Sequence, residues 1–147
     1  MSPTNRTDPL LAGNFVVEIP GIISTAFSEV SGLDASIDVV DYRAGDDPES
    51  APKKLQGLRK FTDITLKRGF TSDLSLWAWF QNGLTGSVAR VDMTIALRDQ
   101  NDVPVLVWKV RNAWPCKWSG PVLLANSSDV AIETLEICHE GIDLVLA

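Results

Sequence analysis

The strongest constraint in the sequence is a regular alternation of apolar and polar residues over 91–98. The apolar positions are Val91, Met93, Ile95 and Leu97, and the intervening ones are Asp92, Thr94, Ala96 and Arg98. A period of two residues puts all four apolar side chains on one face of a β-strand. Residues 99–102, DQND, are turn formers and predict a hairpin to a second strand.

Strand-like segments recur along most of the chain. The predicted strands are 15–19, 27–43 with a break at Gly32, 61–67, 88–98, 103–114, and 130–146 with a break near Gly141. Over 130–140 neither alternate set of residues is cleanly apolar, because Glu133, Glu136 and His139 fall among apolar neighbours. Both faces of this strand are therefore expected to be partly buried, one by the core and one by a partner.

One segment, 73–82, has helical spacing. Its apolar stripe is formed by Leu74, Trp77, Phe80 and Leu84, and is widened by Leu76 and Trp79. Thr71 or Ser72 is predicted to cap its start, and Gly83 to end it. Two interpretations stay open: a helix packed on its own sheets, or one partly covered by a neighbouring subunit.

Length and composition indicate one globular domain over residues 1–147. The chain is 45% hydrophobic and 22% charged, which suits a folded core. A net charge of −6 and a pI near 4.6 argue against specific nucleic-acid binding, which needs a basic face. The sequence has no membrane-spanning apolar run and no signal-peptide pattern near residue 1, so a cytoplasmic site of assembly is expected.

Residues 41–60 form the one long interruption of the strand pattern. Acidic residues fill its first half and basic residues its second: Asp46, Asp47, Glu49, Lys53, Lys54, Arg59 and Lys60. Long irregular segments in compact domains are usually functional or disordered. A segment with this polarity either docks on another copy of the chain or is simply solvated.

No constellation for catalysis, a metal or a cofactor stands out. His139 is the single histidine, and as a strand residue it points away from its neighbour Cys138. The two cysteines, Cys116 and Cys138, predict buried free thiols, and too few His and Cys residues exist for an ordinary zinc site. The sequence therefore indicates neither an enzyme nor a metalloprotein.

Several segments, taken in order, resemble the tail-tube protein family of contractile phages, and most closely the inner tube proteins of extracellular contractile injection systems. They are FVVEIPG (15–21), FSEVSGL (27–33), LQG (55–57), ITLKRG (64–69), NAWP (112–115) and IETLEICHEG (132–141). Each is common by itself, whereas their order and spacing across nearly the whole chain are specific.

The resemblance implies a mainly β fold, with two packed antiparallel sheets forming a barrel-like sandwich, one flanking helix and a long extended hairpin at about 41–60. It also implies hexameric rings that stack into a hollow tube, with the hairpin contacting the next ring. The implied partners are other copies of the chain, a contractile sheath, baseplate or hub and tape-measure or cap proteins, and cargo effectors in the lumen. The chain would assemble in the cytoplasm and act within a phage-tail-like particle, released or cell-anchored.

The candidate residues for these roles come from the predicted strand faces and from the predicted helix. Lumen-lining candidates are Asp34, Ser36, Asp38, Asp63, Thr65, Lys67, Arg90, Asp92, Thr94 and Arg98. Subunit-interface candidates are Trp77, Trp79, Glu133, Glu136 and His139. The alternatives are a tail tube of a contractile phage, a type VI secretion tube and, from another class, a monomeric carbohydrate-binding sandwich using Trp114 and Trp118.

Overall fold

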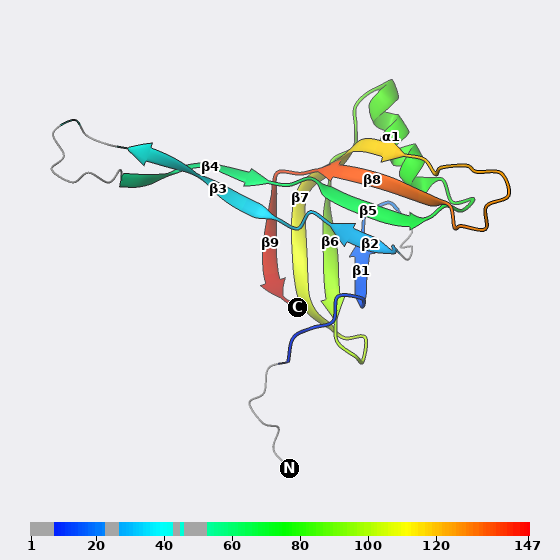
Figure 1. Cartoon of the computed structure of the whole chain (residues 1–147), viewed down its shortest axis with the longest axis horizontal. Helices are drawn as coiled ribbons and strands as arrows, with labels where there is room; N and C mark the ends of the chain where they lie inside the picture. The colour runs from blue at the N-terminus through cyan, green and yellow to red at the C-terminus, as the bar shows by residue number, and fades with distance from the viewer. Residues whose placement is uncertain (1–7, 23–26, 43–44, 46–52) are drawn as a thin grey trace, which may run out of the picture.

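The computed structural model describes residues 8–22, 27–42, 45 and 53–147 (Figure 1). Their strands are β1 (Phe15–Glu18), β2 (Glu29–Ser31), β3 (Ala35–Tyr42), β4 (Lys53–Phe61), β5 (Ile64–Gly69), β6 (Val91–Arg98), β7 (Pro104–Ser119), β8 (Ile132–Cys138) and β9 (Gly141–Leu146). The helix is α1 (Ser75–Thr85). The prediction of a mainly β chain with one helix is confirmed for the described residues.

Two antiparallel sheets pack face to face and share the long strand β7. The first, called the β6 sheet, contains β1, β6, the first part of β7 and β9. The second, called the β8 sheet, contains β2, β5, β8 and the last part of β7. Figure 1 shows the strands of one sheet crossing those of the other steeply. In the described part of the chain the strands form a sandwich and do not close into a barrel.

The core lies between the two sheets and is built by the predicted alternation. Met93 and Ile95 point inward from β6, while Ile64 and Leu66 do so from β5. The predicted turn after β6 is present, because Asp99 N donates to Val103 O at 2.9 Å. The full buried apolar cluster comprises Val17, Ile19, Ile64, Leu66, Leu76, Trp79, Met93, Ile95, Val110, Ala113, Leu135 and Ile137.

The helix begins and ends later than the sequence predicts. Neither Thr71 nor Ser72 caps it; the Ser75 backbone N–H instead donates to Asp73 Oδ1 at 3.0 Å. Gly83 does not end the helix but lies inside it, where its Cα faces Val88: a Cβ there would meet Val88 Cβ at 3.3 Å. The glycine therefore permits a close approach rather than a left-handed stop.

The buried face of α1 also differs from the predicted stripe. Leu76 and Trp79 are buried, whereas Leu74 and Leu84 are 56% and 63% exposed. The helix contacts β7, and Trp77 packs edge-on against Trp118 with ring centroids 4.8 Å apart. One face of α1 therefore packs on its own sandwich, and two leucines are left at the surface.

Strands β3 and β4 form a separate two-stranded antiparallel sheet that projects from the sandwich (Figure 1). It is the long hairpin that the resemblance implied, but it begins earlier than residue 41 and its second strand occupies much of the predicted interruption. The predicted acidic residues Asp46, Asp47 and Glu49 lie outside the described residues.

Candidate assembly interface

The projecting hairpin carries apolar side chains that the rest of the chain does not cover. Those at least about half exposed are Ile37 (50%), Val39 (64%), Val40 (49%), Tyr42 (51%), Leu55 (52%) and Leu58 (72%). An isolated two-stranded ribbon is marginally stable in water, and unpaired strand edges with apolar side chains favour association. The hairpin therefore has the composition of a surface that another protein covers.

Charges along the hairpin are partly compensated within it. Lys60 Nζ lies 3.0 Å from Asp38 Oδ2, and Lys54 stands opposite Asp41 across the ribbon. Lys53 and Arg59 are exposed on the same strand, opposite Tyr42 and Ile37. The second strand of the hairpin is therefore basic as predicted, and at least Lys54 and Lys60 face acidic residues of the hairpin itself.

The base of the hairpin is tied to the turn between β8 and β9 through His139. Its Nε2 lies 2.9 Å from Thr62 O, and its Nδ1 accepts a hydrogen bond from Gly141 N at 3.2 Å. This pattern assigns the neutral tautomer with the proton on Nε2. The ring also packs against Phe61, with centroids 5.8 Å apart. His139 therefore holds the position of the hairpin, and both ring nitrogens are engaged by backbone.

Two predicted interface residues are in the interior of the chain. Trp79 is 6% exposed and its Nε1 donates to Ala89 O at 3.0 Å. Glu133 is 2% exposed, is paired with Arg68 on β5, and accepts from Trp118 Nε1 at 3.1 Å. Neither side chain has surface to offer a partner. Trp77 is half-buried under its aromatic neighbours, and Glu136 is half-buried on the outer face of β8.

The loop between β7 and β8 forms a second apolar surface, which the sequence analysis missed. Val122, Leu123 and Leu124 are 81%, 83% and 67% exposed, and Val130 is 75% exposed. With parts of β2 and β5 they line an open groove. The available signal was the unalternated apolar run after Gly120, which fits neither a strand nor a helix.

The carbohydrate-site alternative finds little support in the two tryptophans it named. Trp118 is half-buried between α1 and Glu133. The ring of Trp114 is stacked under the Arg90 guanidinium, 5.6 Å from the ring centroid. Arg90 itself is paired with Glu140 at 3.1 Å. The two rings therefore pack within this chain rather than forming a shared open platform.

Residues 11–143 match the family model described as T4-like virus tail tube protein gp19. The chain belongs to this tail tube family. A search of curated proteins found no match.

Solved structures agree with the family. A chain in the extended-state PVC sheath-tube complex, an extracellular contractile injection system, is 28% identical with a TM-score of 0.84, over 95% of this chain and 93% of that one. A chain of the anti-feeding prophage baseplate is 26% identical with a TM-score of 0.81, over 95% and 97%. Hcp1 from Flavobacterium johnsoniae is 17% identical with a TM-score of 0.56, over 88% and 93%, and shows the fold alone.

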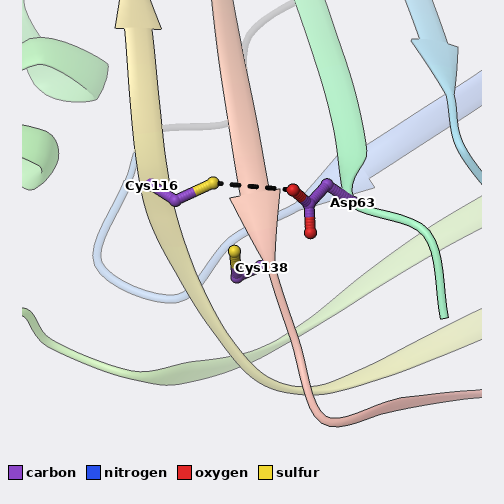
Figure 2. Close-up of side chains that lie close together, drawn as sticks. All are labelled: Asp63, Cys116 and Cys138. Atoms are coloured by element: carbon purple, nitrogen blue, oxygen red, sulfur yellow. Dashed lines mark hydrogen bonds between the residues drawn. The ribbon is translucent and has the colours of Figure 1, made fainter. Parts of the chain in front are cut away.

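The residues predicted to line the lumen of a tube lie on opposite faces of the sandwich. Asp92, Thr94 and Arg98 lie on the outer face of the β6 sheet, with Arg90 just before it. Thr65 and Lys67 lie on the outer face of the β8 sheet, and Asp63 at its edge beside two cysteines (Figure 2). Asp34 precedes the hairpin, and Ser36 and Asp38 are on it. One bore cannot be lined by both outer faces.

Several of these side chains also have partners within the chain. Arg98 Nη2 donates to Asn14 Oδ1 at 2.9 Å, and Asp92 Oδ1 accepts from Asn112 N at 2.9 Å. Lys67 Nζ lies 3.1 Å from Glu29 Oε2 on the adjacent strand. No helix in the described part of the chain is long and apolar enough to cross a membrane.

Proposed function

We propose that this chain is the inner-tube subunit of a contractile injection particle, with residues 1–147 forming one tube domain. Copies associate into hexameric rings, and the rings stack into a hollow tube. The 28% identity to a chain of a sheath-tube complex of an extracellular contractile injection system supports this assignment over the type VI alternative, whose resemblance is one of fold alone. The matched family is described from a phage tail tube, so it supports a tube subunit of either a phage or an injection particle.

The observation that carries the proposal is the projecting β3–β4 hairpin. Its apolar side chains lie outside the sandwich core, so the chain alone gains little from burying them. A head-to-tail contact with the next copy would bury them and, because such contacts need not close, would extend a filament. The exposed apolar loop at 122–124 offers a second surface within the same assembly.

The outer face of the β8 sheet is the better candidate for the bore. Two fully polar rows cross it in register, Ser31–Thr65–Glu136–Lys117 and Glu29–Lys67–Thr134–Ser119. The outer face of the β6 sheet carries one polar row, Glu18–Thr94–Lys109–Asp143, and beside it an apolar row, Val16–Ala96–Val107–Val145. A bore of mixed polar groups lets cargo pass with little adhesion, whereas an apolar row suits a covered outer wall.

The remaining partners follow from the particle. A contractile sheath surrounds the tube, a baseplate or hub starts it, a tape-measure or cap protein sets its end, and effector cargo travels in the lumen. The chain acts mechanically and not as an enzyme. In support, both nitrogens of its one histidine are engaged by backbone groups. Assembly in the cytoplasm precedes incorporation into the particle.

Hairpin charge variants test the inter-ring contact. Lys53→Glu with Lys54→Glu is expected to stop tube growth, measured as filament length by negative-stain electron microscopy. Because Lys54 faces Asp41, the matched control is the swap Asp41→Lys with Lys54→Asp, which keeps the pair within the hairpin. Growth lost in both variants indicates that Lys54 contacts another copy. Normal tubes from the double Glu variant would contradict the proposed contact.

Apolar hairpin variants test the same surface without changing charge. Val39→Ser with Leu58→Ser removes two side chains that are 64% and 72% exposed, so the fold of the single chain is expected to keep its stability within about 0.5 kcal/mol. Tube formation should be lost, while Gln56→Ala on the same ribbon should leave it intact. Unchanged tubes from the double Ser variant would remove the hairpin from the interface.

A further inference from the structure

Three adjacent strands of the β8 sheet bring one potential metal ligand each to the same place. Asp63 immediately precedes β5, Cys116 lies on β7 and Cys138 ends β8. Figure 2 shows the three side chains converging over the outer side of β8. Their ligand atoms all lie within 4.8 Å of one another. Cys116 Sγ is 3.9 Å from Asp63 Oδ2 and 3.4 Å from Glu136 O.

Strand register explains why residues distant in sequence meet there. Ile64 pairs with Ile137, which pairs with Pro115, and the two isoleucine side chains are fully buried. Their neighbours Asp63, Cys138 and Cys116 therefore face outward at the same end of the sheet. The register shift between Pro115 and Lys117 places Cys116 at a bulge, a device that redirects side chains.

The donor set suits a thiophilic cation. Zinc bonds of about 2.3 Å to thiolate and about 2.0–2.2 Å to carboxylate place tetrahedral donors about 3.5–3.8 Å apart. The present separations of up to 4.8 Å would have to contract by about 1 Å on binding. Both cysteines are half-buried and Asp63 is exposed, so a water has access to a fourth position.

The local electrostatics also favour a cation. The Asp63 carboxylate forms no ion pair with the described residues. A divalent cation would compensate the carboxylate and displace the thiol protons, as metals do at cysteine sites.

We propose that Asp63, Cys116 and Cys138 form a binding site for a thiophilic divalent cation of the zinc class. The bound ion would link β5, β7 and β8 at the point where Thr62 and Asp63 connect the end of β4 to the start of β5. Its effect would be to stiffen the base of the projecting hairpin. The site lies within one chain, so it does not depend on the proposed tube.

The test is titration of the reduced, metal-free full chain with Zn²⁺ by calorimetry and with Cd²⁺ by ultraviolet absorption. The expected result is one ion per chain, a thiolate-to-cadmium charge-transfer band and a melting temperature raised by several degrees with zinc. Cys116→Ser and Cys138→Ser each remove one thiolate ligand. Each variant should therefore lower the intensity of the cadmium charge-transfer band and weaken zinc binding. Asp63→Asn should weaken it by about tenfold or more, because a neutral amide is a poorer ligand.

The matched control is Glu136→Gln, which alters a nearby potential ligand outside the trio and should leave zinc affinity unchanged. Circular dichroism of each metal-free variant checks that the fold is kept, and Cys138→Ala replaces any Ser variant that fails to fold. Zinc binding that survives the double variant Cys116→Ser with Cys138→Ser would overturn the site. So would loss of both free thiols in air with no zinc affinity in the reduced chain, which would indicate a disulfide pair instead.

Discussion

Arg68 on β5 and Glu133 on β8 form an ion pair in which both side chains are almost fully buried. The guanidinium also reaches Asp73 ahead of α1, with Nη1 3.3 Å from Oδ2 and Nη2 donating to Asp73 O at 3.0 Å. The second carboxylate oxygen of Glu133 accepts from Trp118 on β7. One buried network therefore joins the start of the helix to three strands of the β8 sheet.

Removing Glu133 from this network should be strongly destabilising. Glu133→Leu removes the buried carboxylate partner of the buried Arg68, although Asp73 still contacts the guanidinium, and it should cost about 3 kcal/mol in the free energy of unfolding. Arg68→Leu combined with Glu133→Leu should recover part of that loss, because the buried cation is removed together with its buried partner. Urea unfolding measures both, with Glu136→Leu on the outer face as control. A single Glu133→Leu variant as stable as the parent chain would show that the pair is not a structural anchor.

Stability should fall in acid partly through Asp73. The hydrogen bond from Ser75 N, assisted by the Arg68 charge, lowers the pKa of Asp73 below its ordinary value of 3.8. Since the folded pKa is below the unfolded one, the contribution is complete above the unfolded pKa and is lost as pH falls through the folded pKa. Asp73→Asn should therefore flatten the acid limb of a stability–pH curve below about pH 4. An identical acid limb in parent and variant would contradict this assignment.

Two glycines with similar backbone angles should respond differently to alanine. Gly21 has φ +82°, and no described residue would lie within 4 Å of a Cβ there, whereas Gly32 has φ +87° and a Cβ there would lie 2.1 Å from Asp63 O. Gly21→Ala should cost about 1–2 kcal/mol of unfolding free energy from backbone strain. Gly32→Ala should cost the same strain plus about 1–3 kcal/mol of unfolding free energy from the clash with Asp63 O. Equal losses in denaturant unfolding would mean that the β2–β3 corner relaxes freely.

Cys138 should be alkylated slowly, and its alkylation rate should keep rising with pH where the rate of an ordinary thiol has already levelled off. The thiolate is the reactive form, and a pKa raised by burial to about 12 keeps its fraction rising about tenfold per pH unit through about pH 10. Iodoacetamide labelling of the reduced, metal-free chain, followed by peptide mass spectrometry, measures the rate. The same peptide in urea provides the control, because an ordinary thiol with pKa about 8.5 levels off earlier. Matching pH profiles in the folded and unfolded chains would refute the shifted pKa.

The bore assignment can be tested with two cysteine probes in assembled tubes. In a background carrying Cys116→Ser and Cys138→Ser, Thr65→Cys should be shielded from a bulky reagent applied outside the tube. Thr94→Cys on the opposite sheet should react more readily unless a sheath covers it. The reverse order of labelling, quantified by mass spectrometry, would place the β6 sheet at the lumen.

Local alternation predicts a strand such as β6, because its inward-facing residues recur at every second position and are apolar. The signal is weaker for β5 and β8, whose buried faces each include a charged residue, Arg68 and Glu133. Local alternation fails for β4, whose sequence KKLQGLRKF has no buried face in this chain and so no periodic signal. The helix boundaries shift because Asp73 is held by Arg68 and Ser75 outside the first turn. Contacts between side chains on different strands cannot be predicted from the periodicity of one segment.

The same limit applies to the candidate sites. The sequence suggests Glu133 as an interface residue because a carboxylate interrupts an apolar strand, but its partner Arg68 lies 65 positions away in sequence. The Asp63–Cys116–Cys138 cluster depends on the register of three strands and on a bulge at Cys116. The exposed hairpin can be inferred only through the family resemblance, which supplies the extension that composition does not.

The central claim is most directly tested by negative-stain electron microscopy of the purified full chain at several concentrations, with particle mass measured by light scattering. Six-fold rings or hollow filaments, appearing either spontaneously or when the cognate baseplate component is added, are the predicted result. A chain that stays monomeric at every concentration and also in the presence of that baseplate component would contradict the tube assignment.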